Sequence, residues 1–167
     1  MRKLFFLLPL FIGLCTIAEA QDARALYEEG VKLKDQKKTA AAAEKFKQAI
    51  ELRPGYTEAL YELGWCRNDG KDYKAAIEVL RQVMPVWSDV YKANFELGYA
   101  FEKTSDSDSA LFYYNRCIEI NPDNANVYKQ LGNIAYQNDE NEEALKNYML
   151  YEERVKVPIT DYLHWYR

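Results

Sequence analysis

The stretch FELGYAFEKT, residues 95–104, reads as a helix with a glycine in its middle. Phe95, Leu97 and Phe101 are side chains that belong in a packed interior. Gly98 lies among them, although glycine costs a helix about 1 kcal/mol relative to alanine. A glycine at such a position indicates a packing requirement, which should recur if it belongs to the architecture.

The glycine recurs with a period of 34 residues. Three sets of residues follow this period: the glycines Gly30, Gly64, Gly98 and Gly132, the alanines Ala42, Ala76, Ala110 and Ala144, and the large side chains four residues later, Phe46, Leu80, Tyr114 and Tyr148. A fixed period of about 20 to 50 residues is typical of proteins built from stacked repeats.

Each repeat is predicted to contain two helices. In the second repeat, Leu60 and Leu63 share one helical face, and Ala76 and Leu80 share another. The intervening NDGKDY, residues 68–73, consists of residues that favour turns. We therefore expect antiparallel helical hairpins, in which glycine on the first helix and alanine on the second allow the two backbones to approach.

These features resemble the tetratricopeptide-repeat family, whose 34-residue units carry a Leu-Gly dipeptide, a later alanine and a closing proline. The Leu-Gly dipeptide occurs in LGW, LGY and LGN, at residues 63–65, 97–99 and 131–133. The first repeat has Glu29-Gly30 instead. The closing prolines of the first and third repeats are Pro54 and Pro122. The resemblance covers residues 23–156. It implies an all-α, right-handed superhelical solenoid of four repeats, about 23–56, 57–90, 91–124 and 125–158, followed by a short C-terminal helix over 159–167.

Departures from the pattern have a physical reading. The outer repeats of a stack face water on one side. The first repeat has Glu29 and Lys32 at positions that are apolar in later repeats. The fourth repeat has Glu152 and Arg154 at positions that are apolar in earlier repeats. Both ends of the stack of repeats are therefore expected to be polar. Pro85 should stop or kink the second helix of the second repeat near Met84, leaving Trp87 in a longer connection, either as a filler or as a contact residue.

Residues 1–20 are predicted to be a signal peptide. Arg2 and Lys3 precede a short apolar run, and Ala18-Glu19-Ala20 supplies the small-x-small pattern before a cleavage site. Export to the periplasm or the medium is expected. A lipid anchor through Cys15 is the alternative, which Leu14 disfavours because a small residue is usual there.

The chain remaining after cleavage, residues 21–167, is expected to form one domain. It would carry 20 basic and 25 acidic side chains, which gives no basic face for nucleic acid. No later stretch is apolar enough for a transmembrane helix. Cys66 and Cys117 fall more than one repeat apart, so we expect two buried thiols and no disulfide.

In the family that the sequence resembles, the first helices line a concave groove. The sequence positions that line this groove in the family carry a row of aromatic residues here, followed by lysines. The candidate ligand-binding residues are Tyr27, Tyr61, Trp65, Lys92, Phe95, Tyr99, Lys129, Asn133 and Tyr136. Trp65 and Tyr99 are the most informative of these, because their place more often carries a polar residue. Aromatic side chains are common in binding hot spots.

Charge along this wall is uneven. Glu58, Glu62 and Asp69 make the second repeat acidic, whereas Lys92 and Lys103 contribute basic charge further on. Some relatives hold a chaperone's C-terminal carboxylate in a Lys/Asn clamp. The positions of that clamp carry Tyr27, Val31 and Glu96 in this sequence, and only Lys92 matches a clamp residue. We therefore do not expect this clamp here.

Catalytic patterns are absent from the sequence. The single histidine, His164, has no cysteine or acid patterned beside it, so no metal site is predicted. SDSDS, residues 105–109, is interpreted as a helix N-cap and not a calcium loop. No cofactor is expected.

The sequence thus predicts a non-catalytic scaffold that binds a peptide or protein segment in its aromatic groove, within an envelope or secreted complex. A glycan-binding accessory protein that uses the same rings is the alternative. The aromatic C-terminal residues Tyr162, Leu163, Trp165 and Tyr166 either pack on the fourth repeat or mediate homo-oligomerisation.

Overall fold

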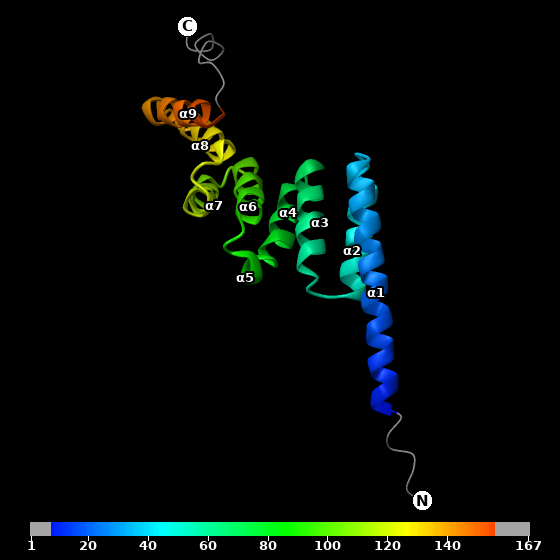
Figure 1. The fold of residues 1–167 in the computed structure, drawn as a ribbon. Coiled ribbons are helices and arrows are strands. Elements are labelled where there is room, and N and C mark those ends of the chain that lie inside the picture. Colours follow the sequence, from blue (N-terminus) through cyan, green and yellow to red (C-terminus); the bar gives the residue numbers. More distant parts are fainter. Residues whose placement is uncertain (1–7, 156–167) are drawn as a thin grey trace, which may run out of the picture. The chain divides into compact units, whose positions relative to one another are not determined.

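The computed structural model describes the backbone of residues 8–155 and the side chains of residues 21–155. Within this range the chain is all-α (Figure 1). The helices are α1 Leu8–Asp35, α2 Thr39–Leu52, α3 Thr57–Asp69, α4 Tyr73–Arg81, α5 Met84–Trp87, α6 Tyr91–Lys103, α7 Ser107–Ile120, α8 Ala125–Gln137 and α9 Asn141–Val155. The predicted helix over 159–167 lies outside the described residues.

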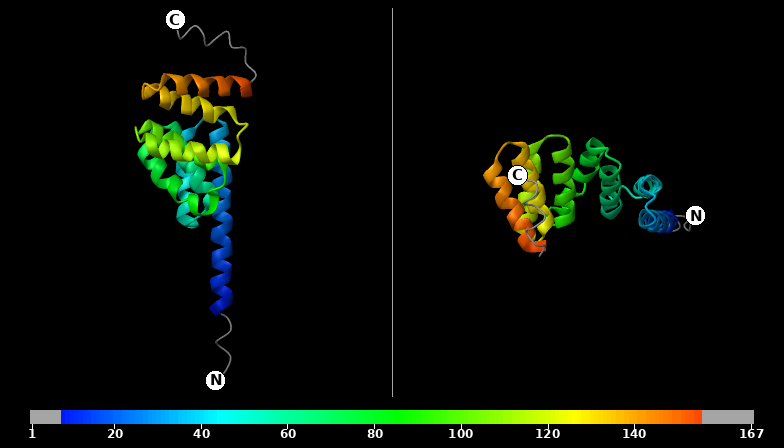
Figure 2. Two further views of the ribbon diagram at one scale, coloured as in Figure 1. Left: turned by 90° about the vertical axis from the view of Figure 1, so that its left-hand side faces the viewer. Right: turned by 90° about the horizontal axis from the view of Figure 1, so that it is seen from above.

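The chain divides into two compact units, Met1–Val86 and Trp87–Arg167. The N-terminal unit contains the hairpins α1/α2 and α3/α4, and the C-terminal unit contains α6/α7 and α8/α9. Two further views show the paired helices of each hairpin side by side (Figure 2). The predicted pairs of helices per repeat are confirmed. The boundary between the units falls in α5, at the irregular end of the second repeat.

The predicted cleavage point after Ala20 falls inside a continuous helix. Helix α1 begins at Leu8 and runs to Asp35. The structure does not test cleavage, which stays a prediction.

Each in-phase glycine makes room for a side chain of its partner helix. A Cβ built on Gly98 would lie 2.7 Å from Cε1 of Tyr114, and one on Gly64 would lie 2.5 Å from Cγ of Leu80. Gly30 and Gly132 stand in the same relation to Phe46 and Tyr148, with 2.6 Å in both cases. The expected role is therefore refined. The space left by each glycine is filled by the large residue four positions after the alanine, and Ala42, Ala76, Ala110 and Ala144 are fully buried beside it.

Every hairpin turn uses a left-handed residue that is not glycine. Lys37, Lys71, Ser105 and Asp139 have φ of 60–62° and recur every 34 residues. In the second repeat, the N–H of Lys71 donates to Asn68 O at 3.0 Å and that of Asp72 donates to Arg67 O at 2.8 Å. These two bonds form a Schellman motif, which satisfies carbonyls at the helix end.

The SDSDS stretch is a helix N-cap, as interpreted from the sequence. Asp106 precedes α7, and its Oδ1 accepts a hydrogen bond from the N–H of Ser109 at 3.1 Å. The side chain satisfies one of the free donors of the first helical turn.

The second helix of the second repeat stops close to Met84, as predicted. Helix α4 ends at Arg81, and Pro85 lies within the first turn of the short helix α5, where a missing N–H is tolerated. The following connection is held by Asn94, which is 1% exposed. Its Nδ2 donates to Ser88 O at 2.8 Å and to Val90 O at 3.0 Å.

The two outer repeats differ in how polar their outer faces are. Glu29 and Lys32 are exposed, as predicted for a leading repeat. The prediction for the end of α9 was wrong, because Glu152 is only 6% exposed. The last turn of α9 packs back onto the start of α8: the Arg154 guanidinium lies 4.3 Å from the Tyr128 ring centre and Nε donates to Pro122 O at 2.8 Å.

Both predicted thiols are buried and free. Cys66 packs with Ala42, Phe46 and Leu63 in the N-terminal unit, and Cys117 lies on α7 with no exposed surface. The predicted burial of both cysteines is confirmed.

Candidate partner-binding surface

The predicted groove residues of the first repeats divide into packed and accessible rings. Tyr27 lies 5.7 Å from the Phe46 ring centre and 5.2 Å from that of Tyr56, so it contributes to the core. Tyr61 is only 7% exposed. Trp65 is half-buried and keeps part of its indole at the surface. Of the three predicted rings in the N-terminal unit, Trp65 is therefore the best placed to meet a partner.

Trp65 carries a lysine that is held by a buried glutamate. Lys34 Nζ lies 5.1 Å from the Trp65 ring centre and 2.5 Å from Glu62 Oε2. Glu62 is 8% exposed, and Lys34 comes from α1 whereas the other two residues come from α3. An ammonium over an indole face is attracted by the ring's quadrupole. The pairing with Glu62 fixes its position.

A second arrangement of the same kind occurs in the C-terminal unit, around Tyr99. Lys103 Nζ lies 5.0 Å from the Tyr99 ring centre and 2.6 Å from Glu102 Oε1. Glu102 is 7% exposed, and its other oxygen accepts a hydrogen bond from the Tyr114 hydroxyl at 2.9 Å. Trp65 and Tyr99 are 34 residues apart, so each occupies the same place in its repeat.

These two arrangements are named the Trp65 set (Lys34, Glu62, Trp65) and the Tyr99 set (Tyr99, Glu102, Lys103, Tyr114). Each combines a half-buried ring, a lysine and a buried carboxylate. Sequence reasoning identified both rings but missed that a lysine would cover each one. The sequence carries no common signal for this, because Lys34 comes from the preceding repeat and Lys103 from the same helix as its ring.

The remaining candidates of the third repeat lie near the Tyr99 set. Phe95 stacks on Tyr91, with 5.9 Å between ring centres, and contacts Tyr114 at 5.7 Å. Lys92 Nζ lies 4.8 Å from the ring centre of Trp87, which is half-buried. Trp87 is therefore partly accessible and has a lysine beside its ring.

The three candidate ligand-binding residues of the fourth repeat differ in how accessible their side chains are. Asn133 Oδ1 accepts from the Tyr148 hydroxyl at 2.9 Å, which ties it to the hairpin interior. Lys129 is exposed, with Nζ 5.8 Å from the Tyr151 ring centre. Tyr136 is 57% exposed. Tyr136 and Lys129 are thus accessible, whereas Asn133 has an internal role.

Burial keeps the hydroxyl of the Tyr99 set neutral. Desolvation raises the pKa of Tyr114 far above its ordinary value, and the negative charge of Glu102 raises it further. The tyrosine therefore remains a donor to Glu102. In the N-terminal unit, desolvation and the charge of Glu62 likewise raise the pKa of Cys66, to about 12, so that this thiol is not a nucleophile at neutral pH.

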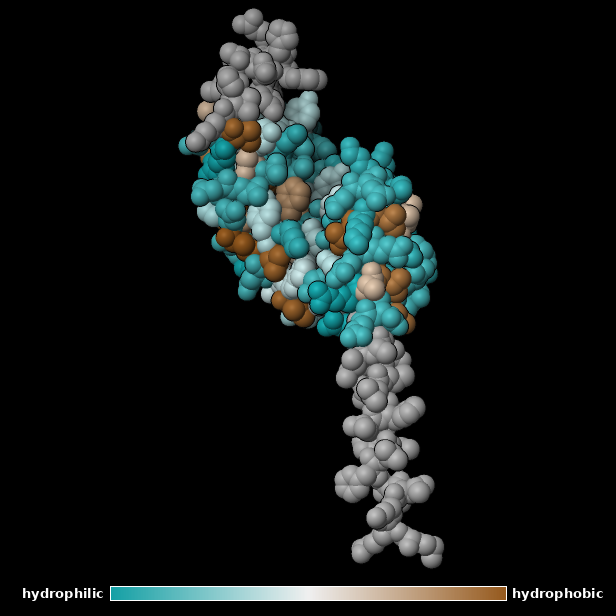
Figure 3. Space-filling view, turned by 45° about the vertical axis from the view of Figure 1, so that its right-hand side comes forward, coloured by the Kyte–Doolittle hydropathy of each residue, from teal (hydrophilic) through white to brown (hydrophobic). Residues whose placement is uncertain are grey.

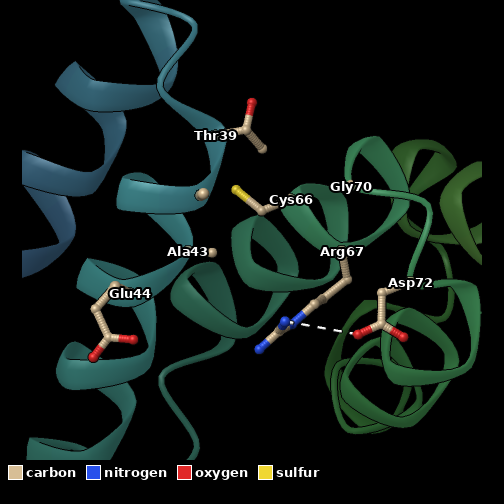
Figure 4. A pocket seen from close by; sticks show the side chains of 8 residues that line it. Thr39, Ala43, Glu44, Cys66, Arg67, Gly70 and Asp72 are labelled. Atoms are coloured by element: carbon tan, nitrogen blue, oxygen red, sulfur yellow. Dashed lines mark ion pairs between the residues drawn. The ribbon is translucent and has the colours of Figure 1, made fainter.

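A separate pocket of about 380 Å³ lies between α2 and α3 (Figure 4). Thr39 and Ala43 line it from α2, and Cys66 and Arg67 line it from α3. Arg67 forms an ion pair with Asp72 at 3.7 Å, drawn as the dashed line. Its lining suggests no catalytic arrangement.

The surface is otherwise mostly polar on the face seen in Figure 3, where apolar side chains form small scattered groups. In the part of the chain with described side chains, no three His, Cys, Asp or Glu residues cluster to hold a metal ion. A search of the described helices finds none with the length and apolar character of a membrane span.

Sequence comparison identifies the class of protein. Three family models described as tetratricopeptide repeat match residues 33–86, 91–124 and 113–146. Together these ranges cover more than half of the chain, and the hairpins described above have the corresponding structure. The chain belongs to the tetratricopeptide-repeat family, whose members are generally non-catalytic interaction modules. A search of curated proteins found no match.

Solved structures share the fold. A crystal structure of MamA is 23% identical with a TM-score of 0.75, over 81% of this chain and 79% of that chain. MamA 41-end from Desulfovibrio magneticus RS-1 is 22% identical with a TM-score of 0.77, over 81% and 76%. The first tetratricopeptide domain of Spaghetti (RPAP3), bound to the HSP90 peptide SRMEEVD, is 20% identical with a TM-score of 0.67, over 71% and 94%.

Proposed function

We propose that this protein is a non-catalytic scaffold that binds a peptide or protein segment through the Trp65 set and the Tyr99 set. The observation that carries the proposal is that the half-buried rings at the same place in two repeats each have a lysine over them, although the two lysines come from different places. Phe95, Lys92, Lys129 and Tyr136 extend these surfaces in the C-terminal unit.

The chemistry of the two sets suits a polypeptide ligand. A half-buried ring is rigid and offers apolar area to a side chain at little entropic cost. The adjacent lysine offers donors to backbone carbonyls or carboxylates of the ligand, while the buried glutamate orients it. Apolar and polar recognition within one small area is typical of binding hot spots.

The mode of binding is proposed to differ from a carboxylate clamp. The Spaghetti (RPAP3) domain is seen with the HSP90 peptide SRMEEVD. In this chain Tyr27 has a packed ring, and Glu96 stands where an arginine would be needed. Affinity is therefore assigned to the lysines and to the ring surface left accessible beside them, rather than to capture of a terminal carboxylate.

The glycan alternative has less support. Stacking on a pyranose needs an open aromatic face, and a lysine ammonium lies about 5 Å from the ring centre of both Trp65 and Tyr99. Titration of Trp65 fluorescence with oligosaccharides and with short peptides separates the two ideas. A response to peptides alone supports the proposal, and a response to oligosaccharides alone contradicts it.

The principal test is partner capture by the tagged mature chain from native envelope extract. Replacing both rings, Trp65→Ala with Tyr99→Ala, should abolish recovery of co-purifying proteins. Phe112→Ala is the matched control, because Phe112 is an exposed ring, 60% accessible, on the second helix of its hairpin. Undiminished capture by the double variant would contradict the proposal.

We also propose that the protein is exported, to the periplasm or the medium. The support is the sequence of residues 1–20, with Arg2 and Lys3 before an apolar run and Ala20 at the cleavage place. Mass spectrometry of protein from its native source should find an N-terminus at Gln21. A lipid-modified Cys15 would instead indicate an anchored protein, and an intact Met1 would contradict export by cleavage.

A further inference from the structure

A groove of about 360 Å³ lies within the C-terminal unit, where α7, α8 and α9 meet. Its floor is apolar, because Leu131 and Ile134 of α8 line it and both are at most 8% exposed. Its walls include the half-buried Leu111 of α7 and Leu150 of α9. The volume is near the lower end of the range of ligand pockets, about 300–1,000 Å³, so the groove can hold a few side chains of a partner.

The pocket of the N-terminal unit shown in Figure 4 occupies the same place in its own repeats. Each of the two sites lies between the second helix of one repeat and the hairpin that follows it. Four lining residues of the groove follow a lining residue of the pocket by two repeat periods: Leu111 follows Ala43, Ile134 follows Cys66, Ala135 follows Arg67, and Glu140 follows Asp72. The pocket is therefore an internal reference for the groove.

The backbone holds the acidic residue in the same way at both sites. The N–H of Asp72 donates to Arg67 O at 2.8 Å. In the fourth repeat, the N–H of Glu140 donates to Ala135 O at 2.9 Å. The carbonyl oxygen of each acidic residue then accepts from the N–H four positions later, at 2.9 Å in both repeats. Each acid is thus fixed beside the same position of the preceding helix.

The two sites differ in the cation beside this acid. In the pocket, Nη1 of Arg67 lies 3.7 Å from Oδ2 of Asp72 (Figure 4). In the groove, the arginine is replaced by Ala135, whose methyl group carries no charge. Glu140 is exposed and has no ion pair with any residue whose side chain the structure describes. The groove therefore retains the carboxylate of this pair without its guanidinium.

The lysine that lines the groove does not replace the missing arginine. Lys146 Nζ lies 3.2 Å from both carboxylate oxygens of Glu143. Nδ2 of the buried Asn147 also donates to Oε1 of Glu143, at 3.1 Å. The polar wall on α9 is paired within itself, so a cation for Glu140 has to come from outside the described part of the chain.

We propose that this groove binds a segment of a partner protein in which an arginine is next to apolar side chains. The arginine pairs with Glu140 as Arg67 pairs with Asp72, because opposite charges attract and a planar guanidinium matches a carboxylate. The apolar neighbours of the arginine cover Leu111 and Leu150, which removes apolar surface of both molecules from water.

This site is separate from the surface described under the proposed function. None of the residues that line the groove belongs to the Trp65 set or the Tyr99 set. The two binding activities can therefore be removed independently, and the failure of one proposal leaves the other standing.

The test uses methyl NMR of the mature chain, residues 21–167, with two synthetic peptides. Acetyl-Leu-Arg-Leu-Leu-amide carries the proposed chemistry, and a second peptide has citrulline in place of arginine, which keeps the shape of the side chain without its charge. The arginine peptide should shift the methyl signals of Leu111, Ile134 and Leu150 until they saturate. The citrulline peptide should bind about two- to five-fold more weakly, as expected for the loss of an exposed ion pair.

Variants of the chain then test the partner of the arginine. Glu140→Gln should abolish the difference in affinity between the two peptides. Glu142→Gln is the matched control, since Glu142 is an exposed residue of α9 that does not line the groove, and it should keep the difference. Ala135→Arg supplies the missing guanidinium from the chain itself and should block both peptides. If this variant fails to fold, Glu140→Gln decides the test, because Glu140 is exposed.

Three results would overturn the proposal. The first is the absence of shifts at the three groove residues with millimolar peptide, and the second is equal affinity for the two peptides. Shifts confined to residues of the Trp65 set or the Tyr99 set count as the first result. The third is movement of the groove signals on dilution of the chain without peptide, which would assign the groove to a second copy of the chain.

Discussion

Four left-handed residues close the hairpin turns, and none of them is glycine. An L-residue in the left-handed region costs about 1–2 kcal/mol, whereas glycine there loses about 0.5–1 kcal/mol through its flexible unfolded state. Lys71 has φ of 62° although Gly70 directly precedes it with φ of −75°. The turn chemistry of these repeats is therefore not optimised for stability.

Lys71→Gly should stabilise the protein by about 0.5–1 kcal/mol, because it removes left-handed strain at an exposed position. Urea denaturation followed by circular dichroism measures the change. Lys74→Gly, on the neighbouring helix α4, is the control and should destabilise by about 1 kcal/mol. A loss of stability in Lys71→Gly would show that the lysine side chain contributes more than its backbone costs.

The two buried thiols predict a loss of stability at alkaline pH. Desolvation raises the pKa of Cys66 and of Cys117 from 9.0 to about 12. Between these values the unfolded chain has released protons that the folded chain still holds, so the free energy of unfolding falls as pH rises. Denaturation at pH 8, 9 and 10 should show a decline above pH 9 that is shallower in Cys66→Ala with Cys117→Ala. Equal slopes would contradict this assignment.

At the scale of the hairpin, each glycine fits one side chain of the partner helix. Tyr114 is fully buried and its hydroxyl is bonded to Glu102, so its ring cannot move away from a new methyl group. Tyr148 is only half-buried, and its hydroxyl donates to the half-buried Asn133 instead of a buried carboxylate, so its ring can move more easily. The same substitution should therefore have different costs in the third and fourth repeats.

Gly98→Ala should destabilise the protein by about 1–2 kcal/mol, because overpacking exceeds the gain of about 1 kcal/mol in helix propensity. Gly132→Ala should cost clearly less. Thermal and urea denaturation of the two variants provide the comparison. Equal costs, or a stabilised Gly98→Ala protein, would contradict the fit of glycine to ring.

The connection before α6 depends on one buried amide. Asn94 is itself buried and donates to two carbonyls, so alanine would remove both hydrogen bonds and the packing of the amide. Asn94→Ala should therefore cost about 1–3 kcal/mol. Asn126→Ala, at an exposed position of α8, is the control and should change stability by less than about 0.5 kcal/mol. Similar effects of the two variants would show that the connection does not rely on Asn94.

Most of the hairpin architecture was predictable, because a 34-residue period in glycine and alanine is a property of the sequence itself. The end of α4 was predictable only to within a few residues, because Pro85 marks a break without specifying which residue ends the helix. The burial of Glu152 was missed because a polar residue was equated with a water-facing one, whereas the end of α9 packs back onto α8.

The candidate surface was predictable only in part. Trp65 and Tyr99 were singled out by their place in the repeat, but the lysines above them depend on side-chain contacts, between α1 and α3 for Lys34 and within α6 for Lys103. Tyr61 shares its place with partly accessible rings and is nonetheless buried. Such differences arise from neighbouring side chains, which a repeat pattern does not encode.

At the scale of the whole molecule, the residues that build the hairpins and those proposed to meet a partner are largely different. The glycines are buried, as are the filling side chains Phe46, Leu80 and Tyr114, whereas Trp65 and Tyr99 keep accessible surface. Tyr114 is the exception, because it both fills the space at Gly98 and bonds to Glu102. Packing variants and surface variants should therefore affect stability and binding separately.

The most direct test measures melting temperature and partner capture together in two variants. Trp65→Ala with Tyr99→Ala should lose capture with little change in melting temperature, whereas Gly132→Ala should melt earlier and still capture its partner well below that temperature. If the double variant still captures the partner, or if capture in both variants simply follows the melting temperature, the two rings are not the binding surface.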